Sequence, residues 1–165
     1  GRPYGIRSGR AVIMAEDALR TPPALSRALV LGGGLVGCET AEALALRGAN
    51  VTILELRAEL APDMHPRARK FLLKNLREHG AEFLLETQVV SIGETGDVSV
   101  RDKYGNEYVL PRHDAIILAL GYRPNNGLCR ELAAARMPFT PLGDCVRPGR
   151  IMDAVHAARS AVCAL

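Results

Sequence analysis

The sequence has little of what marks several common classes of protein. Its 165 residues include no tryptophan, and aromatic residues make up only 4% of them. So few aromatic side chains argue against a surface that stacks nucleic-acid bases. The 21 Lys and Arg are interspersed with 18 Asp and Glu, for a net charge of +3, and they form no basic block. We therefore expect no nucleic-acid partner.

Long apolar segments and clustered metal ligands are also missing. There is no apolar run of about 18 residues, so we expect no transmembrane helix, and the polar start at residues 1–10 does not resemble a signal peptide. The four cysteines stand far apart: Cys38, Cys129, Cys145 and Cys163. They form no C-x-x-C pair, and no histidine is spaced to complete a zinc site. These absences predict a cytoplasmic protein with reduced thiols, no bound metal and no membrane contact.

Apolar patterns in the middle of the chain predict alternating strands and helices. Strands are expected at 28–31, 51–55, 83–85 and 115–120, and helices at 35–47 and about 63–79. From residue 88 the apolar period changes to two, which predicts an antiparallel meander of three short strands up to residue 110. The sequence thus predicts an α/β fold: a Rossmann-like βαβαβ parallel sheet with a three-stranded antiparallel meander.

A glycine-rich loop follows the first of these strands and opens a helix, the context in which the spacing G-x-G-x-x-G binds a dinucleotide. Gly32 allows a tight turn, Gly34 lets a pyrophosphate approach the backbone, and Gly37 lets helix and strand come close. The helix N-terminus would supply free N–H groups to the phosphates. The candidate cofactor-binding residues of this loop are consecutive: Gly32, Gly33, Gly34, Leu35, Val36 and Gly37.

The end of the second strand carries an acid, as expected for a ribose-binding position. Glu55 could accept hydrogen bonds from both ribose hydroxyls and would repel a 2′-phosphate, which favours NADH over NADPH. Arg57 favours NADPH instead, because an arginine there could pair with a 2′-phosphate, so NADPH is kept as an alternative cofactor. Glu55, Leu56 and Arg57 complete the candidate nucleotide site on this side.

Other interpretations of the loop are weaker but distinct. The glycines could form a tight turn that binds nothing, although the strand, the helix and the acid all agree with a cofactor site. FAD and S-adenosylmethionine use similar loops. A class I methyltransferase would have a mostly parallel seven-stranded sheet, and the predicted meander at 88–110 breaks that pattern.

Three segments together resemble the two-dinucleotide flavoprotein reductases, in which an NAD(P)H domain is inserted in an FAD domain. Residues 28–41 are similar to the glycine-loop segment of their NAD(P)H domain, and residues 119–125 to the A-x-G element that leads back to the FAD domain. Gly143-Asp144, before a predicted helix from 151, is similar to the late G-D motif of the FAD domain. The resemblance implies that Gly121 lies near the nicotinamide and that Asp144 contacts the ribityl chain of FAD.

More narrowly, residues 35–41 and 147–158 look like the NADH:flavin oxidoreductase, 2,4-dienoyl-CoA reductase and enoate reductase family. Members of that branch also carry an FMN-containing barrel of the old-yellow-enzyme type and an iron–sulfur cluster. Neither the barrel, nor cluster cysteines, nor the first FAD glycine loop is found in these 165 residues. We therefore expect FMN and the cluster elsewhere in a full-length chain, and no catalytic residue in this one.

The resulting hypothesis divides the chain into three parts. Residues 1–23 are expected to be a linker and a remnant of the FAD domain, residues 24–120 the NAD(P)H-binding domain, and residues 121–165 the C-terminal segment of the FAD domain. NADH would pass a hydride to the flavin, and the electrons would go on to an enoate- or enoyl-type acceptor, or to another acceptor, outside this chain. The partners would be the nicotinamide dinucleotide and the missing FAD half and barrel. The alternative is a standalone NAD-binding or NAD-sensing domain, and the sequence leaves the oligomeric state open.

Overall fold

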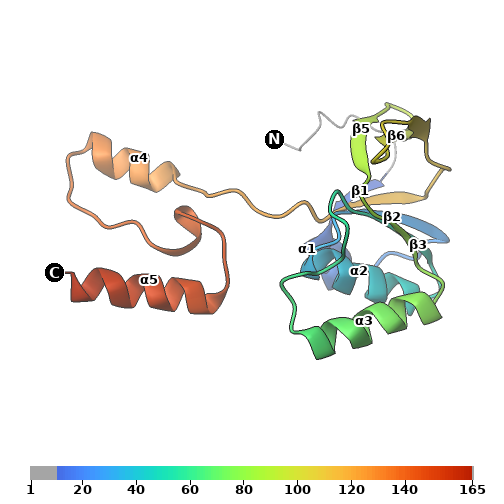
Figure 1. Cartoon of the computed structure of the whole chain (residues 1–165). Helices are drawn as coiled ribbons and strands as arrows, with labels where there is room; N and C mark the ends of the chain where they lie inside the picture. Colours follow the sequence, from blue (N-terminus) through green and yellow to red (C-terminus); the bar gives the residue numbers. More distant parts are fainter. Residues whose placement is uncertain (1–10, 165) are drawn as a thin grey trace. The chain divides into compact units, whose positions relative to one another are not determined.

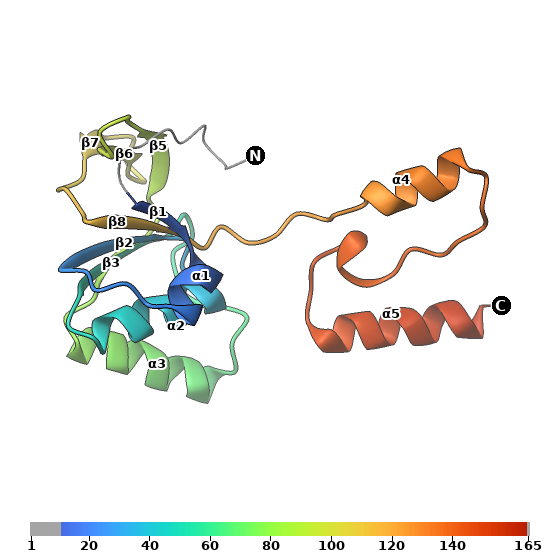
Figure 2. The same cartoon turned by 180° about the vertical axis from the view of Figure 1, so that it is seen from behind.

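The structure, a computed structural model, describes residues 11–164. The chain divides between Leu120 and Gly121 into two units. Within the described residues, all strands belong to the first unit, whereas the second contains only helices and connecting segments (Figures 1 and 2).

The first unit is built on a parallel sheet of five strands in the order β1-β8-β2-β3-β4. Its elements, in chain order, are β1 (Ala11–Met14), α1 (Ala15–Arg20), β2 (Arg27–Leu31), α2 (Leu35–Ala45), β3 (Asn50–Leu54), α3 (Pro66–Glu78), β4 (Glu82–Leu84) and β8 (Ala115–Leu118). A separate antiparallel sheet lies between β4 and β8 in the sequence: β5 (Gln88–Ile92), β6 (Val98–Arg101) and β7 (Glu107–Val109). These two sheets confirm the predicted fold class.

The parallel sheet is covered on both faces, which explains why its strands are apolar throughout. Side chains alternate between the faces of a strand. On β2, Ala28 and Val30 pack with the helices α1, α2 and α3. Leu29 and Leu31 pack on the other side with apolar residues of the meander, among them Val100. Figures 1 and 2 show the three helices on one side of the sheet and β5–β7 on the other.

One part of the predicted domain division is wrong. Residues 11–20, expected to belong to a linker and remnant of the FAD domain, form β1 and α1 of the parallel sheet. β1 pairs with β8, with Val12 opposite Ile116, and Ala15 and Ala18 of α1 are buried in the core. A strand of four residues followed by a helix of six has too short an apolar pattern to be distinguished from a linker. Residues 1–10 of the predicted linker lie outside the described residues.

The second unit contains α4 (Gly127–Ala134), a short 3-10 helix (Gly143–Cys145) and α5 (Ile151–Cys163). None of its described residues is buried. The apolar side chains of α5 are largely in solvent, and Ile151 is 86% exposed. A second unit of this kind has no apolar core of its own. Within residues 11–164, no helix combines the length and the apolar character needed to cross a bilayer.

A buried histidine lies at the N-terminal edge of the parallel sheet. His113 is 8% exposed, and its Nε2 is 3.4 Å from Oγ1 of Thr52. Burial, and secondly the nearby charge of Arg27, lower the pKa of His113 below its usual 6.5, whereas Asp114 and Glu82 act in the opposite direction. The folded protein therefore favours the neutral imidazole.

This shift predicts an acid-sensitive fold. Because the pKa of His113 is lower in the folded than in the unfolded chain, the unfolded chain binds more protons once the pH falls below 6.5. The free energy of unfolding should therefore fall as the pH is lowered through that value. In the variant His113→Asn, the free energy of unfolding, measured by urea denaturation at a series of pH values, should change less steeply with pH. The matched control His156→Asn removes an exposed histidine of α5, and its free energy of unfolding should depend on pH as in the parent chain.

Candidate functional site

The candidate site lies where three parallel strands end. Gly32 follows β2, Glu55 follows β3, and Ala119 follows β8. The Gly32 N–H donates to the carbonyl of Leu54 (2.9 Å), and the Ala119 N–H donates to that of Leu31 (2.8 Å), so the backbone hydrogen bonding continues past the strands. In open α/β sheets, the carboxyl ends of the strands form the edge at which ligands bind.

Two glycines of the loop are required by close backbone contacts. Gly32 has φ +103°, and a Cβ there would overlap the carbonyl oxygen of Ala119. A Cβ on Gly37 would overlap the carbonyl oxygen of Gly32. The first turn of α2 is thereby held against the ends of β2 and β8, which only residues without side chains permit.

Gly34 differs, because the space where its Cβ would lie is open to 4 Å. It is the N-cap of α2 and has an extended conformation (φ −68°, ψ −176°) that any residue could adopt. It supplies no side chain to cap the helix, so the first N–H groups of α2, beginning at Leu35 and Val36, face an uncapped end. An uncapped helix N-terminus beside open space is suited to an anion.

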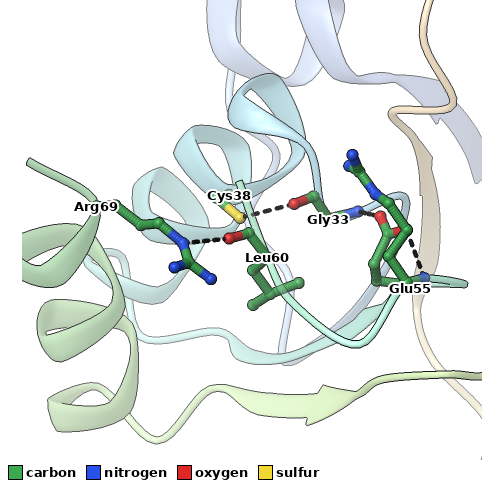
Figure 3. A network of polar contacts seen from close by, with 6 residues as sticks. Gly33, Cys38, Glu55, Leu60 and Arg69 are labelled. Atoms are coloured by element: carbon green, nitrogen blue, oxygen red, sulfur yellow. Dashed lines mark hydrogen bonds and ion pairs between the residues drawn. The ribbon is translucent and has the colours of Figure 1, made fainter. Parts of the chain in front are cut away.

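The carboxylate of Glu55 is turned inward onto the loop (Figure 3). Its Oε2 accepts a hydrogen bond from the Gly33 N–H at 2.6 Å. Its Oε1 accepts from the Arg57 backbone N–H at 2.9 Å and from the Arg57 Nε at 3.2 Å. Glu55 is only 7% exposed, whereas Leu56 is 65% exposed. The structure thus brings Gly33, Glu55 and Arg57 together.

The segment of residues 56–65 also contacts the loop, and beyond Leu56 and Arg57 no sequence motif marks it. The Ala61 N–H donates to the Gly33 carbonyl at 2.7 Å, and the buried Leu60 side chain fills the space beside the Gly33 Cα. On α3, Arg69 donates from Nε to the carbonyl of Leu60 at 2.7 Å. An irregular segment without a motif is recognised only from such contacts.

Two of the described cysteines, Cys38 and Cys129, have a raised pKa, so neither is activated as a nucleophile. The Cys38 thiol lies 3.4 Å from the Gly33 carbonyl, and burial, assisted by the charge of Glu55, raises the pKa of Cys38 to about 12. Cys129 on α4 forms a side-chain hydrogen bond with Cys145. Partial desolvation of Cys129, and secondly this hydrogen bond, raise the pKa of Cys129. Both shifts favour the thiol over the reactive thiolate.

Gly121 and Asp144 belong to the second unit, which is described separately from the unit that carries the glycine loop. Gly121 is exposed and has φ +80°. Asp144 Oδ1 accepts a hydrogen bond from the Gly149 N–H at 3.2 Å. Asp144 also lines a pocket of about 340 Å³ between the 3-10 helix and the start of α5. At that start, the Arg150 N–H donates to Asp153 Oδ2 at 2.8 Å.

A parallel sheet with a glycine loop, an uncapped helix and a strand-end acid defines a dinucleotide-binding domain. The sequence model of the pyridine nucleotide-disulphide oxidoreductases matches residues 5–146, and the chain belongs to this family. Members of the family use NADH and FAD. Membership confirms the broader resemblance to the two-dinucleotide flavoprotein reductases, and the homologues are NAD(P)H-dependent flavin oxidoreductases, as predicted.

Individual relatives are longer than this chain. An NADH oxidase of Thermoanaerobacter brockii is 34% identical over 130 residues, which are 78% of this chain and 20% of the relative. A metal reductase of Desulforamulus reducens is 31% identical, in a match that covers 94% of this chain and 27% of the relative. The chain therefore spans about a quarter of the length of these relatives. The solved structure of 6-hydroxypseudooxynicotine amine oxidase from Pseudomonas geniculata N1 shares the fold (TM-score 0.79, 24% identity, 97% of this chain and 27% of that one).

The glycine geometry predicts two different responses to alanine. Gly37→Ala places a methyl group against the Gly32 carbonyl oxygen, so the loop must shift. We expect a loss of roughly 1–3 kcal/mol in the free energy of unfolding, typical of an overpacked site. The control Gly34→Ala introduces the same methyl group into open space and should cost about 1 kcal/mol or less. Chemical denaturation of both variants measures this, and equal losses would contradict the assigned difference.

Proposed function

We propose that this chain is the NADH-binding portion of an FAD-dependent oxidoreductase and that the dinucleotide binds at the glycine loop. The observation that carries the proposal is the open space at Gly34, at the uncapped N-terminus of α2 and beside the buried carboxylate of Glu55. These features supply what the two halves of an adenosine diphosphate moiety require, an anion site and a hydrogen-bond acceptor for ribose.

The pyrophosphate would lie against Gly34 and the first turn of α2. A side chain at Gly34 would occupy the open space from which a phosphate could reach the N–H groups of Leu35 and Val36. The helix dipole adds attraction for negative charge there. Binding at this position would thus use backbone groups.

The ribose would lie at Glu55. A carboxylate has about four acceptor positions, and Glu55 uses three of them, for Gly33 and for the backbone and side chain of Arg57. It therefore retains capacity for a ribose hydroxyl. The carboxylate would repel a 2′-phosphate, and the ion pair at 3.2 Å directs the Arg57 guanidinium toward Glu55. Both features support NADH over NADPH.

We also propose that the second unit forms part of an FAD site. Asp144 and the N-terminus of α5 line one pocket, in which Asp144 would accept a hydrogen bond from the ribityl chain. When both cofactors are bound, NADH would supply a hydride and FAD would accept it. The protein would then contribute position and electrostatics. Gly121 would lie near the nicotinamide, as the resemblance to the family implies.

The electron acceptor is proposed only by class. The resemblance of residues 35–41 and 147–158 to the enoate reductase branch supports an enoate- or enoyl-type acceptor outside this chain, reached through FMN and an iron–sulfur cluster elsewhere in the full-length protein. Among the relatives, the one named metal reductase makes metal ions a competing class of acceptor. A standalone NAD-sensing domain is less well supported, because none of the described residues after Gly121 is buried.

The nucleotide assignment is tested by calorimetric titration with NADH, NADPH and S-adenosylmethionine. The parent chain should bind NADH most tightly. Glu55→Ala should weaken NADH binding about tenfold, equivalent to about 1.4 kcal/mol, and NADPH binding less, since only NADH offers a free 2′-hydroxyl. Glu78→Ala, which removes an exposed acid of α3, is the control and should change neither affinity. Failure of both nicotinamide cofactors to bind, or a greater loss for NADPH, would refute the assignment.

The division into a self-sufficient unit and a dependent one is tested by hydrogen exchange of the isolated chain. Backbone amides of β2, β3 and β8 are in a sheet covered on both faces and should be strongly protected. Amides of α5, which has no buried residue, should exchange at least about 100-fold faster, because a helix of this length without tertiary packing is marginal in water. Comparable protection in both units would favour the standalone alternative.

A further inference from the structure

The segment between β3 and α3, residues 56–65, has no helix or strand but contacts the glycine loop from the side of α3. Both contacts are with Gly33. The Ala61 N–H donates to the Gly33 carbonyl at 2.7 Å, and Leu60, which is 2% exposed, lies against the Gly33 Cα. Because the Gly33 N–H donates to Glu55 at 2.6 Å, Gly33 is held at both its carbonyl and its N–H.

The segment adopts a conformation that is disfavoured without support. Ala61 has φ +43°, in the left-handed region that a residue with a Cβ seldom occupies. Such a conformation persists only where the surrounding contacts fix it. The contacts on either side of Ala61 are therefore what maintain the hydrogen bond to Gly33.

Arg69 of α3 provides that support (Figure 3). Its Nε donates to the Leu60 carbonyl at 2.7 Å, and its Nη2 donates to Glu59 Oε2 at 2.8 Å. A single planar guanidinium thus fixes two consecutive residues just before Ala61. The bond to the Leu60 carbonyl is partly buried, so water competes less for it, whereas the Glu59 side chain is 53% exposed. A lysine could not reproduce the pair, because an ammonium lacks the fixed fork.

We propose that Arg69 is a positioning residue for the dinucleotide. It acts through Leu60 and Ala61, which hold Gly33, and the Gly33 N–H in turn orients the carboxylate of Glu55 toward the ribose. The inference rests on the proposed function for the identity of the ligand. It adds that ribose selection depends on an arginine whose side chain donates to Glu59 and Leu60.

The experiment compares dissociation constants for NADH and NADPH in the 165-residue chain and in three variants. Arg69→Met keeps the apolar stem and removes both donors. We expect NADH binding about tenfold weaker, the scale of a lost charged hydrogen bond, and NADPH binding changed much less. Arg69→Lys should lie between the parent and Arg69→Met. The control Lys74→Met removes a charge from the same helix, at a side chain paired with Glu78 at 3.6 Å, and should bind both cofactors like the parent.

The ratio of the two dissociation constants separates positioning from general damage. A merely structural role of Arg69 would weaken both cofactors alike, and that result would overturn the proposal, as would identical behaviour of Arg69→Met and Lys74→Met. If Arg69→Met does not fold, the test rests on Arg69→Lys. A ratio of NADH and NADPH dissociation constants equal to that of the parent in Arg69→Lys also overturns the proposal. Faster exchange of the Ala61 amide in Arg69→Met without ligand supports the tether itself, and unchanged exchange refutes it. A parent chain that binds neither cofactor refutes the proposed function first.

Discussion

The structure depends on one close approach of backbone to backbone. Gly32, at the end of β2, and Gly37, in the first turn of α2, come so near to each other and to Ala119 that any side chain at either glycine would overlap a carbonyl oxygen. This contact fixes the direction in which α2 leaves the sheet. It also fixes the position of Gly34, whose open side is consequently left at the helix N-terminus. The same backbone geometry therefore determines both the packing of the first helix and the place where an anion could bind.

A buried carboxylate beside a helix N-terminus that is proposed to bind phosphate is an apparent conflict, because like charges would meet there. The structure resolves it through the hydrogen bonds of Glu55. One oxygen is held by the Gly33 N–H, and the other by the backbone and guanidinium of Arg57. Charge on Glu55 is thus compensated by donors on both sides, while the N–H groups at the start of α2 stay available to an anion. Glu55 serves the fold and the proposed ribose site with the same atoms.

Much of this could be predicted from the sequence, because the informative signals are local. The helix from Leu35 and the stop at Gly48, which has φ +88°, follow from periodicity and from a glycine just past the helix end. β1 and α1 could not be predicted, because β1 is recognised only by its pairing with β8, which is distant in sequence. Nor could the support of Gly33 by Ala61 and Arg69, since an irregular loop and an arginine on a basic helix have no distinctive spacing.

The two units differ in how their apolar surface is covered, and this difference bears on the proposed function. The first unit covers one face of its sheet with helices and the other with the meander, so the apolar residues of β2, β3 and β8 are buried inside the unit. The second unit has helices of similar length but none of its described residues is buried, and Val162 of α5 is 68% exposed. Exposed apolar helix surface is stabilised only when another layer covers it. An FAD domain completed by chain outside these residues would supply that layer, which makes the open second unit and the closed first one consequences of a single domain organisation.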